Sequence, residues 1–156
     1  MKILFICTHN RCRSIIAEAV CNHLGGEVLQ ARSAGSQPSG EVHPLSIRYL
    51  EEAGIDTTGL CSQSWDEHED WDPDVVITVC DQAAGEQCPL WFGQCQKVHW
   101  GLADPSRMAG TEEEVATAFR QTIKLLQRRL RSLIAAEPQS LDSEQLSALL
   151  MRLGEV

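Results

Sequence analysis

Short apolar runs alternate with longer amphipathic segments along the chain, a pattern typical of strands and helices that follow one another in turn. Residues 2–6 form a compact apolar run, and residues 74–79 form a second one in which Val75, Val76 and Ile77 stand together. Residues 28–34 and 97–100 are shorter strand candidates. Strands that are buried on both faces read as nearly continuous apolar runs, so the pattern predicts a parallel sheet covered on both sides.

The segments between and after these strands carry apolar residues at the spacing that is typical of helices. A capping box of Thr111 and Glu114 begins the longest predicted helix, and Gly25-Gly26 and Gly54 end two of the others. The predicted helices span residues 14–24, 44–53, 111–135 and 143–153. Pro138 interrupts the chain between the last two. The sequence therefore predicts one domain over residues 1–136 and a C-terminal helical extension over residues 137–156.

Composition narrows the class of protein. The 156 residues carry a formal net charge of −9, which would repel nucleic-acid phosphate over most of the surface. No apolar run has the length of a membrane span, and the apolar N-terminal run is too short for a signal peptide. We expect a cytoplasmic protein with no nucleic-acid or membrane partner.

Seven cysteines are more than a chain of this size needs. Their number is odd and no C-x-x-C pair occurs, which argues against a disulfide framework and against a structural zinc site. Two interpretations remain for each cysteine: a small buried hydrophobic side chain or a reactive thiol.

The segment from Cys7 to Ser14 holds most of the candidate catalytic residues. It connects the first predicted strand to the first predicted helix, where backbone N–H groups at a helix N-terminus can hold an oxyanion. Cys7 at the strand tip would be a thiolate with a lowered pKa. Arg13 would offer two parallel N–H donors, Ser14 would donate to the Cys7 sulfur, and Asn10 tolerates the left-handed backbone of a tight loop.

The expected oxyanion-binding set is the loop Thr8, His9, Asn10, Arg11, Cys12 and Arg13. The competing interpretation is a buried strand-end cysteine followed by a surface arginine. The arrangement C-x5-R-S between a strand and a helix favours the catalytic interpretation.

The loop resembles the catalytic loop of low-molecular-weight protein tyrosine phosphatases and of the arsenate reductases that share their fold. The continuation 14–19 and Ser33-Ala34-Gly35 match both groups, and the match covers roughly residues 1–135. His9 departs from the family, where a small residue is frequent. The resemblance implies a three-layer, flavodoxin-like α/β fold with a four-stranded parallel sheet.

Two features separate the subfamilies. Ser106-Arg107 follows Asp104-Pro105, where the phosphatases usually carry aromatic residues that grip a phosphotyrosine ring. The stretch from Cys80 to Cys88-Pro89 resembles the redox segment of thioredoxin-coupled arsenate reductases. These features favour arsenate reduction, with phosphomonoester hydrolysis by a tyrosine phosphatase as the alternative. An oxyanion-binding module without turnover is a third possibility that the set Cys7, Arg13, Ser14 and Asp104 opposes.

The resemblance also implies a role for each candidate catalytic residue. Cys7 attacks arsenate, Asp104 protonates the leaving oxygen, and Cys80 and then Cys88 relay the disulfide to thioredoxin or to glutathione and glutaredoxin. Cys95 is the rival of Cys88. No cofactor or metal is expected.

Two further sets of residues raise a metal site as an alternative. Some relatives bind potassium at positions matched by Asn10, Glu18 and Ser33, but Gln63 replaces an aspartate there. The acidic run 66–72 is interpreted as a solvated surface rather than as a metal site.

Overall fold

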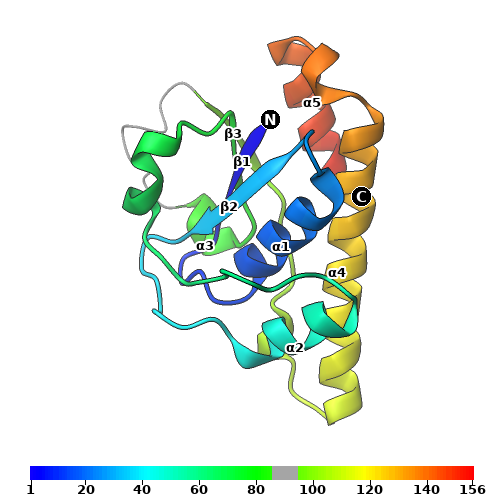
Figure 1. The fold of residues 1–156 in the computed structure, drawn as a ribbon. Helices are drawn as coiled ribbons and strands as arrows, with labels where there is room; N and C mark the ends of the chain where they lie inside the picture. Colours follow the sequence, from blue (N-terminus) through cyan, green and yellow to red (C-terminus); the bar gives the residue numbers. More distant parts are fainter. Residues whose placement is uncertain (86–94) are drawn as a thin grey trace.

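The sheet holds four parallel strands in the order β2-β1-β3-β4 in the computed structural model, which describes residues 1–85 and 95–156 (Figure 1). The strands are β1 (Lys2–Ile6), β2 (Gln30–Ala34), β3 (Val75–Thr78) and β4 (Gln96–His99). The predicted three-layer α/β fold with a four-stranded parallel sheet is confirmed.

Five α-helices and three short 3-10 helices accompany these strands within the described residues. The α-helices are α1 (Arg13–Gly25), α2 (Pro44–Glu52), α3 (Asp81–Ala84), α4 (Glu112–Ala135) and α5 (Ser143–Leu153). The 3-10 helices are η1 (Trp65–Trp71), η3 (Pro105–Arg107) and η4 (Pro138–Ser140). The predicted capping box of Thr111 and Glu114 is present at the start of α4.

The two central strands owe their apolar sequence to burial on both faces. Ile3, Leu4 and Phe5 in β1 and Val75 and Ile77 in β3 are fully buried. Helices α1, α4 and α5 gather on one side of the sheet, and η1, in green, lies on the other (Figure 1). The chain leaves β1 toward one edge and later returns to β3 on the other side of β1. This reversal opens a crevice at the carboxyl ends of β1 and β3.

Helix α5 packs against β4, the strand at one edge of the sheet. Its buried residues Leu149, Leu150 and Leu153 contact the core, and the indole Nε1 of Trp100 donates to the Leu150 carbonyl at 2.8 Å. The division of the chain at residue 136 stays a prediction. No helix in the described part of the chain is both long and apolar enough to span a bilayer.

Several elements differ from the sequence prediction. The second strand begins at Gln30 rather than at residue 28, because Val28 and Leu29 form the turn that follows α1. The acidic run forms η1, and its His68 is buried with Nε2 3.1 Å from the Ser33 carbonyl oxygen. Helix α3 was not predicted, because four residues are too few to show a helical period.

Candidate functional site

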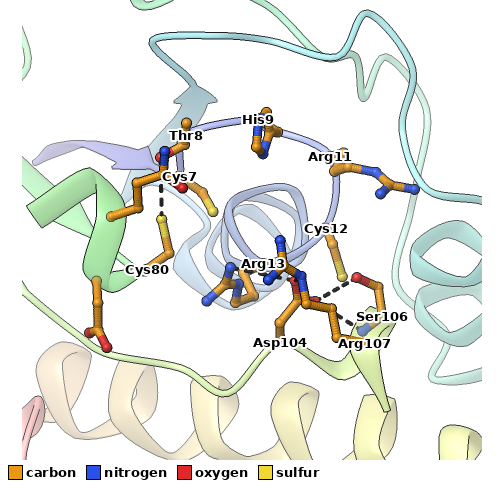
Figure 2. A pocket seen from close by; sticks show the side chains of 12 residues that line it. Cys7, Thr8, His9, Arg11, Cys12, Arg13, Cys80, Asp104, Ser106 and Arg107 are labelled. Atoms are coloured by element: carbon orange, nitrogen blue, oxygen red, sulfur yellow. Dashed lines mark hydrogen bonds and ion pairs between the residues drawn. The ribbon is translucent and has the colours of Figure 1, made fainter. Parts of the chain in front are cut away.

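A cavity of about 300 Å³ lies at the carboxyl ends of β1 and β3, where the crevice was expected. Cys7 and the loop that follows it form one wall, Cys80 and the start of α3 form a second, and Asp104, Ser106 and Arg107 form a third (Figure 2). Three segments that are far apart in the sequence therefore meet here. The structure brings together Cys7, Arg13, Cys80 and Asp104, as the sequence predicted.

Asn10 fixes the shape of the loop. Its φ of 45° is the left-handed conformation that the sequence indicated. Its side chain is fully buried and makes three hydrogen bonds: Nδ2 donates to Ser14 Oγ at 2.7 Å and to Ser33 Oγ at 3.0 Å, and Oδ1 accepts from Gln63 N at 2.9 Å. Asn10 therefore acts as an internal brace rather than as a group that faces the cavity.

Gly35 allows β2 to approach this loop. A Cβ at this position would lie 2.5 Å from the Cys7 carbonyl oxygen and even closer to the Thr8 carbonyl oxygen, which is impossible without a backbone shift. The motif Ser33-Ala34-Gly35 thus has two tasks here: Ser33 holds Asn10, and Gly35 makes room for the loop.

Cys7 and Cys80 line the cavity together, and each thiol shifts the pKa of the other. The Cys7 thiol donates to Cys80, which lowers the pKa of Cys80 to about 5. The backbone N–H of Ala83, at the start of α3, donates to Cys80 Sγ at 3.4 Å, and Thr8 Oγ1 lies 3.8 Å from the same sulfur. Cys80 therefore carries the negative charge of the pair.

The expectation of a lowered pKa for Cys7 is wrong. Its hydrogen bond to Cys80 and its burial both raise the pKa of Cys7, while Arg13 opposes them. The physical reason is that a nearby hydrogen-bond donor, the backbone N–H of Ala83, donates to Cys80 rather than to Cys7. The Arg13 guanidinium instead donates from Nη1 to the Leu102 carbonyl at 3.0 Å.

Asp104 is held at the mouth of the cavity. Its Oδ1 accepts from Ser106 N at 3.0 Å and from Ser106 Oγ at 2.6 Å, and its Oδ2 lies 3.5 Å from Arg13 Nη2. The sequence placed Asp104 in the site, but it did not indicate that Ser106 would hold it.

Ser14 and Glu18 belong to a buried network behind the loop. Ser14 Oγ accepts from Asn10, whereas the sequence analysis expected it to donate to Cys7. Ser33 Oγ donates to Glu18 Oε1 at 2.6 Å, and burial raises the pKa of Glu18 to about 7. Asn10, Glu18 and Ser33 are the residues of the potassium alternative. Across residues 1–85 and 95–156, no group of three or more His, Cys, Asp or Glu side chains is arranged to hold a metal ion.

The other loop residues divide between the floor and the rim. Thr8 and Cys12 are buried, and burial raises the pKa of Cys12 to about 11. His9 and Arg11 are exposed on the rim, and Figure 2 shows the Arg11 side chain directed away from Cys7. Cys12 therefore lines the cavity as an un-ionised thiol.

Two of the remaining cysteines bear on the relay. Cys88 lies outside the described residues, so its predicted role stays a prediction. Cys95 precedes β4 at the amino edge of the sheet, whereas Cys80 follows β3 at the carboxyl edge. The register of β3 and β4 separates the two by six residues along the strands, or about 20 Å.

A histidine that the sequence analysis did not single out contacts α3. His99 Nε2 lies 3.0 Å from Asp81 Oδ1, and His99 Nδ1 lies 2.8 Å from Thr78 Oγ1. Because a carboxylate only accepts hydrogen bonds, Nε2 carries the proton, and Thr78 donates to Nδ1 when the ring is neutral. Asp81 directly follows Cys80, so this contact joins the end of β4 to the start of α3. Only the three-dimensional fold brings these residues together.

Comparisons with known proteins show which family this chain resembles. The family model described as low molecular weight phosphotyrosine protein phosphatase matches residues 2–146. An arsenate reductase from Halalkalibacterium halodurans is 34% identical over 130 residues, which cover 83% of this chain and 92% of that protein.

Two solved structures extend the comparison. An arsenate reductase in the phosphate binding state superposes with a TM-score of 0.71 at 32% identity, over 86% of this chain and 97% of that one. A thioredoxin-dependent arsenate reductase from Corynebacterium glutamicum superposes with a TM-score of 0.67 at 28% identity. It covers 90% of this chain and 63% of that one.

Proposed function

This chain belongs to the low molecular weight phosphotyrosine protein phosphatase family, and we propose that it reduces arsenate to arsenite with Cys7 as the nucleophile. The observation that carries the proposal is that Cys7 and Cys80 line one cavity together with Arg13 and Asp104. A phosphatase needs one thiol, whereas a reductase must supply two electrons. A second thiol in contact with the first meets that need.

The first step forms a thiol–arsenate adduct. The cysteine that attacks must be a thiolate, so the Cys7 proton passes to Cys80 when an oxyanion draws the Arg13 guanidinium away from Leu102. The Cys7 sulfur then attacks arsenic, a sulfur–arsenic bond forms, and an arsenic–oxygen bond breaks. Asp104 delivers the proton with which the departing oxygen leaves as water.

The second step reduces the arsenic. Cys80 loses its proton and attacks the Cys7 sulfur, so that a Cys7–Cys80 disulfide forms and the sulfur–arsenic bond breaks with its electron pair on arsenic. Arsenic(V) becomes arsenic(III), and arsenite leaves after taking up protons. Two thiols have been oxidised for the two electrons that arsenic gained.

The third step regenerates Cys7. We assign it to Cys88, which attacks Cys80 and leaves a Cys80–Cys88 disulfide. Seven residues separate the two cysteines in the chain, so a direct bridge is within reach. Cys95 does not suit this role, because a separation of about 20 Å along the sheet far exceeds the roughly 7 Å limit between bridged Cα atoms.

Thioredoxin is the proposed reductant of this disulfide, by analogy with the thioredoxin-dependent relative. Glutathione with glutaredoxin is the alternative. Either donor, and the free thiols that the cycle needs, fit the reducing cytoplasm that the sequence analysis expects.

A coupled assay tests the proposal. Arsenate-dependent NADPH oxidation is measured with thioredoxin and its reductase, and separately with glutathione and glutaredoxin. We expect turnover with thioredoxin and none in Cys7→Ser. Hydrolysis of phosphotyrosine peptides far faster than arsenate reduction would replace the proposal with a phosphatase.

A further inference from the structure

Two arginines meet on one oxygen atom at the mouth of the cavity. Arg13 Nη2 and Arg107 Nε each lie 3.5 Å from Asp104 Oδ2. Figure 2 shows the Arg107 side chain extending from η3 back over Asp104 toward Arg13. Arg107 lines the cavity together with Cys7. The shared contact therefore places two guanidinium groups beside the position that a bound oxyanion would take.

The two arginines differ in how firmly they are held. The Arg13 side chain is 17% exposed and also donates to the Leu102 carbonyl, whereas the Arg107 side chain is 80% exposed. The carboxylate does not depend on Arg107 for its position, because Ser106 holds Oδ1 with two hydrogen bonds. Arg107 can therefore leave Asp104 without disturbing it.

The charge of the substrate indicates a binding role for Arg107. Arsenate is a dianion near neutral pH, and the protein that receives it has a formal net charge of −9. In-line attack by Cys7 places the leaving oxygen opposite the sulfur, toward Asp104 at the mouth. The other three oxygens then lie on the side of the loop, so the outer oxygen is the one that the loop amides do not reach. Arg107, whose Nε lies 3.5 Å from Asp104 Oδ2, is within reach of that oxygen.

We propose that Arg107 is a second oxyanion-binding residue, which moves from Asp104 Oδ2 to an outer oxygen of arsenate or of another free tetrahedral dianion. This inference rests on the proposed function and names the residue that favours a dianion over a singly charged ligand. Its movement also frees Asp104 Oδ2 at the moment when Asp104 must deliver a proton.

The test measures binding and turnover separately. Inorganic phosphate is titrated into the wild type and Arg107→Ala by calorimetry, and the KM and kcat for arsenate are measured with thioredoxin. Because a charge-assisted hydrogen bond at a partly exposed site is lost, we expect the phosphate Kd and the arsenate KM to rise about five-fold and kcat to change little. Arg107→Lys should recover part of the affinity.

Arg48→Ala is the matched control. Arg48 is an exposed arginine whose Nη1 lies 3.5 Å from Glu112 Oε1, and it does not line this cavity. The control removes the same charge from a similar ion pair and should leave Kd and KM unchanged at 0.15 M salt, where a distant surface charge is largely screened.

The outcomes are separable. An unchanged phosphate Kd in Arg107→Ala overturns the proposal, and so does a loss of kcat alone, because Arg107 would then act only through Asp104. Phosphate binding needs no turnover, so a wild type that binds phosphate but does not reduce arsenate would refute the proposed function and still test Arg107.

Discussion

Glu18 makes the stability of this protein depend on pH near neutrality. Its carboxyl accepts from Ser33 Oγ at 2.6 Å behind the oxyanion loop, and burial raises its pKa from 4.5 to about 7. A raised carboxyl pKa means that the folded state binds the proton more tightly than the unfolded chain does. The free energy of unfolding therefore falls as the pH rises from 4.5 to about 7, and the loss is complete above that range.

The size of the effect follows from the shift. A change of one pKa unit corresponds to 1.36 kcal/mol, so a rise from 4.5 to about 7 costs at most about 3 kcal/mol above neutral pH. Glu18→Gln keeps an oxygen that can accept from Ser33 but never carries the charge. The variant should match the wild type below pH 4.5 and exceed its Tm at pH 8 by up to roughly 6–12 °C.

The assay is thermal unfolding of the reduced proteins at a series of pH values from 4.5 to 8. Glu27→Gln, at an exposed position just after α1, removes the same formal charge and corrects for the net charge of the protein. If the Tm of Glu18→Gln and the Tm of the wild type changed with pH in the same way, the reasoning would be refuted. The loss of stability would then not come from the charge on Glu18.

Other predictions concern the site itself. Arg13→Lys should lower arsenate turnover by about 100-fold or more, because a point ammonium cannot replace the two-donor guanidinium; near wild-type turnover would remove Arg13 from oxyanion binding. Cys80→Ala should lower the pKa of Cys7, because the partner that holds the charge is gone; thiolate absorbance measured against pH would show no change if the pair were not coupled. Slow hydrolysis of para-nitrophenyl phosphate should persist in Cys88→Ser, since Cys7 and Asp104 suffice for it; loss of this hydrolysis would contradict the assigned roles.

The sequence predicted the parts of this protein that depend only on residues close together in the chain. The buried strands β1 and β3 read directly as apolar runs, and the capping box of Thr111 and Glu114 marks the start of α4. The oxyanion loop could be found because a strand end, a cysteine, an arginine and a helix start lie within eight residues. Such features need no knowledge of distant contacts.

The rest depends on contacts between distant segments. The pKa of Cys7 cannot be predicted from its loop alone, because Cys80, which follows another strand, takes the charge. The contact of His99 with Asp81 depends on the pairing of β3 with β4. The sequence gives no periodic or spacing signal for any of these contacts.

The central claim is a disulfide relay that passes from Cys7 to Cys80 and on to Cys88. The most direct measurement treats reduced wild type and Cys88→Ser with arsenate, quenches free thiols, and maps disulfides by mass spectrometry alongside arsenite release. The account predicts one arsenite per protein, a Cys80–Cys88 disulfide in the wild type, and a trapped Cys7–Cys80 disulfide in Cys88→Ser. A Cys80–Cys95 disulfide in the wild type, or arsenite release without any disulfide that contains Cys80, would contradict it.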